Sequence, residues 1–154
     1  MTVSPLALEA IKRAAKKARI SSDKYHYQDV ISRLALPEPY PLQAEIIGSK
    51  AKRKVICAGR RAGKTQLAAI RAVRGLLEGH NVLLTSTSQD QADVFWRRIT
   101  QWTVSLADNG LCKNETKRVL QYRDGRLRVK TGRDPDVLRG EDADLLILDE
   151  CAIS

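Results

Sequence analysis

The hydrophobic and polar positions of this chain form two patterns that alternate along it. One pattern is typical of buried strands and the other of helices. Continuous apolar runs predict strands at VICA (55–58), NVLLTS (81–86) and DLLILDE (144–150), the last of them central in its sheet. Between them, apolar residues at helical spacing predict helices over 64–77 and 89–106. Strands that alternate with helices favour an α/β fold, with an open and mostly parallel sheet flanked by helices.

Three further segments complete the expected organisation. Prolines crowd residues 37–41 and exclude a regular helix or central strand there, so we expect a turn and then a short helix over 42–49. The run KRVLQYRDGRLRVK (117–130) places two strand-like halves around Asp124-Gly125, a dipeptide that suits a tight hairpin turn. Residues 5–20 predict a cationic helix with a narrow apolar stripe, which fits either a solvated surface or contact with DNA phosphates or a partner subunit.

The composition is that of a single soluble domain. The chain has 154 residues, of which 43% are hydrophobic, enough to bury one sizeable core. No apolar run is long enough to cross a membrane, so we expect a cytoplasmic protein without membrane contact. Cys57, Cys112 and Cys151 lack the spacing of a zinc site or a disulfide framework, and we expect reduced, buried thiols.

The net charge of +9 suits a polyanionic partner such as nucleic acid. The excess is uneven, because residues 1–54 carry 11 basic and 5 acidic side chains. Candidate contacts to DNA phosphates are the cationic N-terminal helix and the hairpin arginines Arg123, Arg126 and Arg128. Arginines that alternate along a strand are equally typical of a solvated face.

The segment CAGRRAGKT (57–65) has the pattern of a phosphate-binding loop, with Ala58 in place of the usual first glycine. We expect Gly59 and Gly63 to let the backbone curl so that its N–H groups point inward. Lys64 would reach the β- and γ-phosphates, and the Thr65 hydroxyl would bind Mg²⁺. The predicted nucleotide-binding loop comprises Ala58, Gly59, Arg60, Arg61, Ala62, Gly63, Lys64 and Thr65.

Two carboxylates at the end of DLLILDE complement this loop. Asp149 would hold Mg²⁺ through water, and Glu150 would polarise the attacking water as general base. An acidic pair after an apolar run is common, but its combination with the loop predicts binding and hydrolysis of a nucleoside triphosphate.

Three arginines are candidates for stabilising the charge that develops during hydrolysis. Arg60 and Arg61 lie inside the loop, where two guanidinium groups cannot easily both point inward, so one of them is expected at the surface. Arg139 lies ten residues before Asp149 in DVLRGEDAD, where a solvated loop arginine is an equally good interpretation.

The segments GRRAGKT, TSTSQDQA and DVLRGEDADLLILDE together resemble the ATPase domain of the large terminase subunit, the DNA-packaging motor of tailed bacteriophages. The resemblance covers residues 37–154, and a loop with internal arginines and without the first glycine is its most specific part. It implies a P-loop NTPase fold of the RecA-like kind, with Walker A and Walker B motifs, that hydrolyses ATP with Mg²⁺ in the cytoplasm of a bacterial host cell.

The resemblance also implies residue roles and partners. Gln43 matches the glutamine that reads the adenine edge, Arg60 the loop arginine that acts within its own chain, and Arg139 an arginine that reaches the ATP of a neighbouring subunit. Asp149 and Glu150 match the metal-binding and catalytic carboxylates. The implied partners are double-stranded DNA, the portal protein, the small terminase subunit and further copies of the chain in a ring.

The family's ATPase domain continues beyond the position where this sequence stops, and a nuclease domain follows it. We therefore expect a basic helical segment at 1–36, a partial P-loop ATPase domain at 37–154 that is truncated after the Walker B strand, and no nuclease domain. Two alternatives stay open. One is a helicase-type nucleic-acid ATPase, and the other is an inactive fragment that serves as a DNA-binding or partner-binding module.

Overall fold

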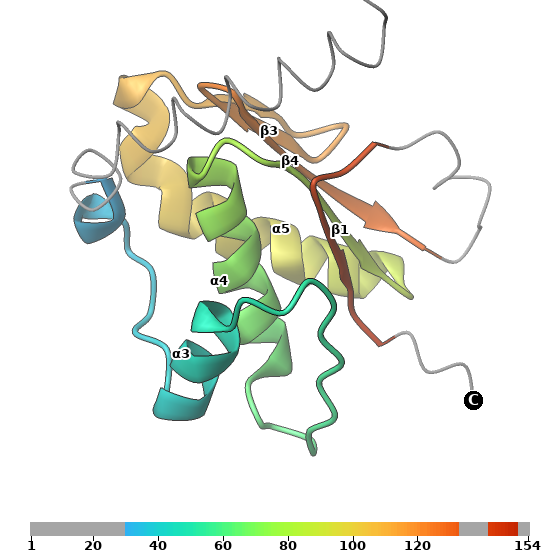
Figure 1. Cartoon of the computed structure of the whole chain (residues 1–154). Coiled ribbons are helices and arrows are strands. Elements are labelled where there is room, and N and C mark those ends of the chain that lie inside the picture. The colour runs from blue at the N-terminus through green and yellow to red at the C-terminus, as the bar shows by residue number, and fades with distance from the viewer. Residues whose placement is uncertain (1–29, 133–141, 151–154) are drawn as a thin grey trace, which may run out of the picture. The chain divides into compact units, whose positions relative to one another are not determined.

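The computed structural model describes residues 30–132 and 142–150 of the chain (Figure 1). The chain divides into two compact units, residues 1–33 and 34–154, and the elements described below belong to the second. The predicted cationic helix at 5–20 lies outside the described residues, as does Cys151. The domain boundary expected at residue 36 and the expected absence of a nuclease domain stay predictions.

Helices and strands alternate along the described chain. The helices are α3 (Pro41–Gly48), α4 (Lys64–Leu77), α5 (Gln89–Thr103) and the short 3₁₀ helix η1 (Val104–Asn109). The strands are β1 (Asn81–Ser86), β2 (Cys112–Asn114), β3 (Val119–Tyr122), β4 (Gly125–Thr131) and β5 (Leu145–Leu148). The predicted helices near residues 42, 64 and 89 and the predicted strand at 81–86 are confirmed. Within the described residues, no helix is long and apolar enough to span a bilayer.

The five strands form one mixed sheet in the order β2-β3-β4-β1-β5. β1 pairs in parallel with both β4 and β5, whereas β2, β3 and β4 pair antiparallel. The expectation of a mostly parallel sheet is therefore right for only half of it, because β3 and β4 form a hairpin whose tight turn forces antiparallel pairing. β5, which was expected at the centre, pairs only with β1 and forms an edge of the described sheet.

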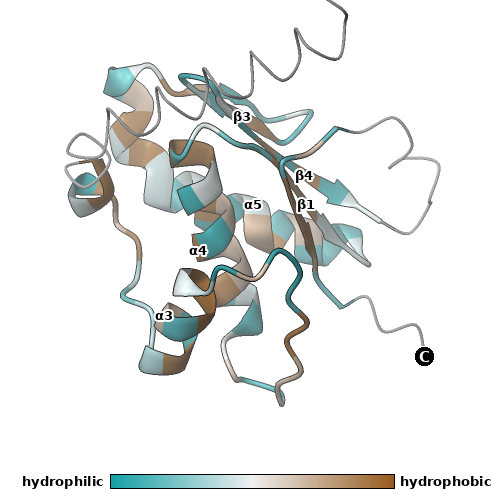
Figure 2. Cartoon of the chain, in the orientation of Figure 1, coloured by the Kyte–Doolittle hydropathy of each residue, from teal (hydrophilic) through white to brown (hydrophobic). Residues whose placement is uncertain are grey.

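α4 and α5 provide the apolar surface that packs on the sheet. Each helix carries a stripe of buried side chains, which Figure 2 shows as brown patches along otherwise pale or teal ribbons. The fully buried members of the core include Ile70, Val73, Leu76, Phe95, Ile99, Val82, Leu84, Leu120 and Leu127. Burial of a side chain of this size contributes roughly 1.5–3 kcal/mol relative to an exposed one, so these contacts fix α4 and its N-terminus relative to β1.

Two glycines allow α4 to lie close to the sheet. A Cβ atom on Gly75 would lie 2.8 Å from Val82 and 2.9 Å from Leu145, and one on Gly125 would lie 1.9 Å from the Leu76 carbonyl oxygen. Gly125 was expected inside the hairpin turn. It instead pairs with Tyr122 in the sheet, because the chain turns through the two residues before Gly125.

The predicted buried strand at 55–58 is wrong. These residues are extended but pair with no strand in the described part of the chain, and the segment is apolar in Figure 2 although it is exposed. Val55 is 91% exposed and Ile56 40% exposed. The expected burial of the cysteines is wrong as well, since Cys57 and Cys112 are free, exposed thiols.

Candidate functional site

The phosphate-binding loop has the turned backbone that its sequence predicts. Gly63 adopts φ 75° and Arg61 φ 63°, and the Ala62 N–H donates to the Gly59 carbonyl at 3.4 Å. α4 begins at Lys64, directly after this turn, so the unpaired N–H groups of its first residues lie at the loop. A helix N-terminus of this kind favours an anion such as phosphate.

Lys64 closes the loop in this structure. Its ammonium donates to the Ala58 carbonyl at 2.5 Å and to the Gly59 carbonyl at 2.9 Å, and the side chain is half-buried. The positive charge is therefore already placed inside the curve of the loop, where phosphate oxygens would compete with the two carbonyls. The hydroxyl-bearing Thr65 follows in the first turn of α4 and is also half-buried.

Gln43 connects α3 to the phosphate loop. The side chain is buried, its Oε1 accepts from the Tyr40 N–H at 3.0 Å, and its Nε2 donates to the Gly63 carbonyl at 3.2 Å. The amide retains one N–H and one lone pair beyond these bonds. Recognition of adenine by Gln43 stays a prediction. The contact with Gly63 is a role that sequence reasoning missed.

A cavity of about 440 Å³ lies between α3 and the loop. Gln43 and Ile46 line it from α3, and Lys54, Cys57, Ala58 and Lys64 line it from the loop side. A volume of this size is typical of sites for small molecules. The cavity has Lys64 among its lining residues, so an occupant would lie next to the ammonium.

The two carboxylates follow β5, as predicted. The Asp149 N–H donates to the Thr85 carbonyl of β1 at 2.9 Å, which continues the parallel pairing to the end of the strand. Burial raises the pKa of Asp149 above its usual value, the charge of Glu150 raises it further, and Lys64 opposes both effects. Lys64 is therefore within electrostatic reach of Asp149, although 85 residues separate them in the sequence.

Gln91 holds the second carboxylate. Its Nε2 donates to Glu150 Oε2 at 2.7 Å, and its Oε1 accepts from the Thr87 hydroxyl at 3.2 Å. Glu150 has φ 52°, a left-handed conformation. This conformation costs a residue with a side chain of order 1–3 kcal/mol and persists only where the surrounding structure imposes it. The segment TSTSQDQA was recognised in the sequence, but no sequence pattern links Gln91 to a residue 59 positions later.

The predicted arginines occupy different surroundings. Arg60 and Arg61 are both exposed and form no ion pair within the described residues, whereas only one of them was expected at the surface. The role of Arg60 in charge stabilisation stays a prediction. Arg139 lies outside the described residues. Arg128, expected as a DNA contact, is buried and donates to Asn81 Oδ1 at 3.0 Å and to the Asp142 carbonyl at 2.6 Å.

The residues fit a magnesium nucleotide better than a free metal ion. Within the part of the chain that the structure describes, no group of three or more histidines, cysteines or carboxylates could hold a metal. Mg²⁺ is commonly bound by one or two protein ligands together with water and phosphates. A carboxylate with a raised pKa, as in Asp149, gains a partner for its charged form when such a cation binds.

Comparison with known proteins identifies relatives of one kind. No family model matches the chain. The terminase large subunit of Thermus virus P23-45 is 28% identical over 137 residues, which cover 75% of this chain and 28% of that protein. A second Thermus phage terminase large subunit gives the same identity and coverage. The chain therefore spans little more than a quarter of the length of these curated relatives.

The solved structures agree. The ATPase domain of the large terminase from Thermus phage P74-26 is 28% identical and superimposes with a TM-score of 0.64, covering 73% of this chain and 53% of that one. A point mutant of the same domain gives a TM-score of 0.66. The resemblance to terminase large subunits that was predicted from the sequence is confirmed, and both of these solved structures are large terminase ATPase domains.

Proposed function

We propose that this chain binds and hydrolyses ATP as the motor region of a terminase large subunit that drives packaging of double-stranded DNA. The observation that supports the proposal is the electrostatic interaction of the loop lysine Lys64 with the half-buried carboxylate Asp149, in a fold that resembles a terminase ATPase domain. Partners in the complete motor would be the portal protein, the small terminase subunit and further copies of the chain.

The loop residues would bind the phosphates. Lys64 exchanges the Ala58 and Gly59 carbonyls for β- and γ-phosphate oxygens, while the N–H groups at the start of α4 orient the same phosphates. Exchange of this kind requires no large movement, because the ammonium already lies within the loop.

The carboxylate residues would carry the hydrolytic step. Thr65 and Asp149 would hold Mg²⁺, which when bound neutralises charge on the phosphates. Glu150 accepts a proton from the attacking water, and Gln91 orients its carboxylate. Arg60 stabilises developing charge from within the chain, with Arg61 and a neighbouring subunit's Arg139 as the other candidates.

Equilibrium binding of Mg²⁺·ATP tests the proposal, with Lys64→Ala as the variant and Lys117→Ala as a control on an exposed turn. A charge-assisted hydrogen bond contributes about 1.5–3 kcal/mol, so Lys64→Ala should weaken binding by about tenfold or more. Lys117→Ala should bind like the unaltered chain. Binding that is absent, or that is independent of Lys64, would contradict the proposed nucleotide site.

Turnover tests the second half of the proposal. Glu150→Gln should abolish hydrolysis while Mg²⁺·ATP binding persists, because the amide retains the shape of the carboxylate but cannot accept the proton. Hydrolysis by the Glu150→Gln variant at the rate of the unaltered chain would remove Glu150 from the mechanism.

A further inference from the structure

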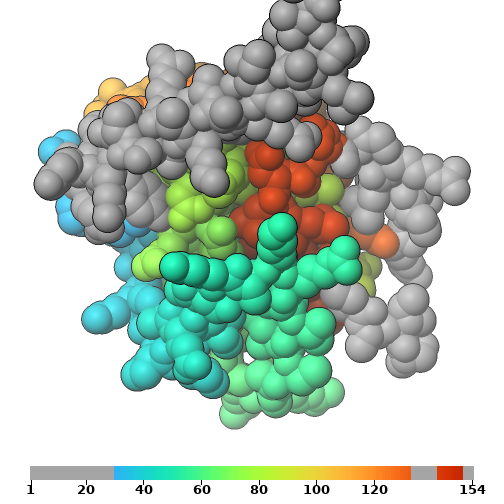
Figure 3. Space-filling model, in the orientation of Figure 1, coloured from blue at the N-terminus to red at the C-terminus, as the bar shows by residue number. Residues whose placement is uncertain are grey.

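The segment SKAKRK at residues 49–54, here called the basic loop, joins α3 to the phosphate-binding loop. It contains four cations in five consecutive positions, Lys50, Lys52, Arg53 and Lys54, and no carboxylate. Every residue of the basic loop is exposed. Figure 3 shows side chains of this part of the chain, in teal, projecting from the surface of the unit.

Lys54 differs from the other three cations because it is used to anchor the loop. Its ammonium donates to the Ile46 carbonyl at 2.7 Å and to the Ser49 carbonyl at 2.8 Å. These acceptors lie at the C-terminal end of α3, where carbonyls lack helical partners and a positive charge is favoured. At the other end of the basic loop the Ser49 N–H donates to the Glu45 carbonyl at 2.9 Å, so both ends are tied to α3.

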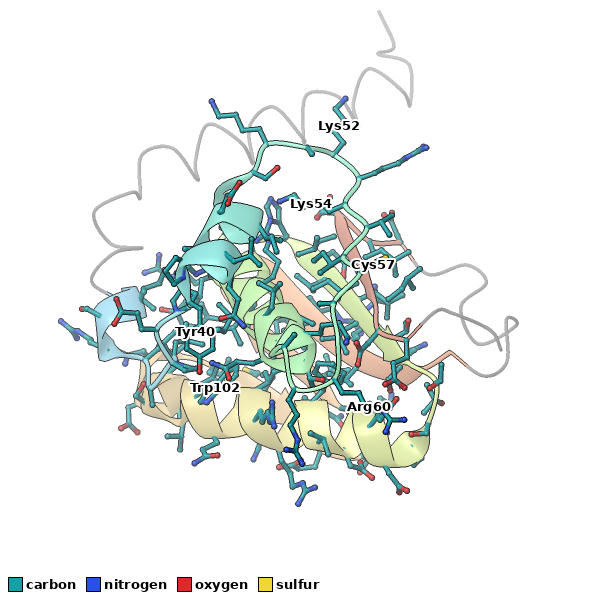
Figure 4. All side chains as sticks on the ribbon, turned by 90° about the horizontal axis from the view of Figure 1, so that it is seen from below. Tyr40, Lys52, Lys54, Cys57, Arg60 and Trp102 are labelled. Atoms are coloured by element: carbon teal, nitrogen blue, oxygen red, sulfur yellow. The ribbon has the colours of Figure 1, made fainter. Side chains whose placement is uncertain are left out.

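The anchor leaves Lys50, Lys52 and Arg53 directed toward solvent. Figure 4 shows Lys52 pointing away from the unit and Lys54 pointing back toward α3. Within the described residues these three cations form no ion pair. Like charges on neighbouring residues repel one another, and a polyanion would relieve that repulsion.

Four other basic residues of the described chain have partners. Ion pairs join Arg71 to Glu78, Lys113 to Glu115 and Arg118 to Asp93. Arg123 lies over the Tyr122 ring at 5.6 Å from its centroid. The basic loop is thus a concentrated set of cations without carboxylate partners in a segment whose backbone is held in place.

We propose that the basic loop binds the phosphates of double-stranded DNA, without reading its sequence, through Lys50, Lys52 and Arg53. The proposal rests on the proposed DNA-packaging function and assigns a surface to the DNA. From Lys50 to Arg53 the backbone spans at most about 10 Å. The three cations are therefore close enough together for their long side chains to contact neighbouring phosphates of one strand.

The position of the basic loop gives this contact a consequence for the nucleotide site. One end of the loop is bonded to α3, whose Gln43 donates to the Gly63 carbonyl. The other end continues through 55–58 directly into the phosphate-binding loop. DNA held by the basic loop would therefore be linked to both sides of the nucleotide site.

Fluorescence anisotropy with a labelled duplex of arbitrary sequence tests the proposal. The test variant is Lys50→Gln/Lys52→Gln/Arg53→Gln, which spares the anchor Lys54. The control is Arg97→Gln/Arg98→Gln/Lys117→Gln, which removes the same charge from exposed positions outside the basic loop. The slope of log K against log salt changes by about 0.9 for each phosphate contact, so the test variant should flatten it by nearly 3 units and the control much less.

An equal slope and an equal affinity for the two variants would overturn the proposal, and so would failure of the unaltered chain to bind DNA. The same titration with polyaspartate serves as a second probe. If the test variant lost binding to polyaspartate but retained binding to DNA, the loop would be assigned to an acidic protein instead, and the proposal would be overturned as well. Mg²⁺·ATP binding is measured on the unaltered chain, the test variant and the control. This measurement separates the proposal of DNA binding by the basic loop from the proposed ATPase function. A chain that binds DNA through the loop but binds no ATP would contradict the proposed function alone.

Discussion

Replacement of Gly63 by alanine perturbs the nucleotide site through a single methyl group. Gly63 has φ 75°, and a Cβ atom there would lie 2.7 Å from Gln43 Nε2. A contact under 3.0 Å cannot persist, so the Gln43 side chain must move away from the loop. Its movement breaks the hydrogen bonds that Gln43 forms with the Gly63 carbonyl and the Tyr40 N–H.

The magnitude follows from two separable costs. The left-handed conformation costs a residue with a Cβ atom about 1–2 kcal/mol. Each lost hydrogen bond costs about 0.5–1.5 kcal/mol, so Gly63→Ala should destabilise the fold by roughly 2–5 kcal/mol in total. In a Gln43→Ala background the hydrogen bonds are already absent, and only the conformational cost of about 1–2 kcal/mol should remain.

Urea denaturation of the unaltered chain, both single variants and the double variant measures these values as a double-mutant cycle. The two substitutions should be non-additive by about 1–3 kcal/mol, the sum of the two hydrogen bonds. Additivity within about 0.5 kcal/mol would refute the contact between Gln43 and the loop. Gly48→Ala is the matched control, since a Cβ atom there meets nothing within 4 Å and the fold should tolerate it.

Two further predictions concern the carboxylates. Gln91→Met should lower ATP turnover by about tenfold, because the carboxylate of Glu150 loses the side chain that orients it. Gln101→Met on the exposed face of α5 is the control, and turnover by Gln91→Met at the rate of the unaltered chain would contradict the assignment. Because burial raises the pKa of Asp149, the folded state binds more protons than the unfolded state between the two pKa values, and stability falls as pH rises through that window. Asp149→Asn should therefore stabilise the ligand-free chain at neutral pH but not at a pH below both values, as thermal denaturation at the two pH values would measure.

The parts of the fold that were predicted correctly are those that local sequence decides. The helix α4 is an example, because its own sequence decides where it lies and where it ends. It carries a stripe of apolar residues, and the left-handed Gly79 follows it. The turn at Gly63 and the start of α4 at Lys64 were predictable for the same reason, because these residues are contiguous. Binding of phosphate there stays a prediction.

The parts that were missed depend on what lies opposite a residue in space. Apolar character alone predicted burial of 55–58, but burial of a strand needs a neighbouring strand to pair with, and the described sheet has none there. Gly125 signals a turn in the sequence, whereas the structure requires it because the Leu76 carbonyl lies above it. The contact between Gln91 and Glu150 arises only when β1 and β5 pair.

The exposed apolar side chains of β5 bear on how the purified protein would behave. Leu146 is 53% exposed and Leu148 50% exposed, and the apolar segment at 55–58 is exposed as well. An edge strand with apolar side chains is a template for pairing with a second chain, which leads to aggregation. We therefore expect self-association to increase with protein concentration and hydrophobic dyes to bind the native chain. Charged substitutions at Leu146 or Leu148 should reduce both effects.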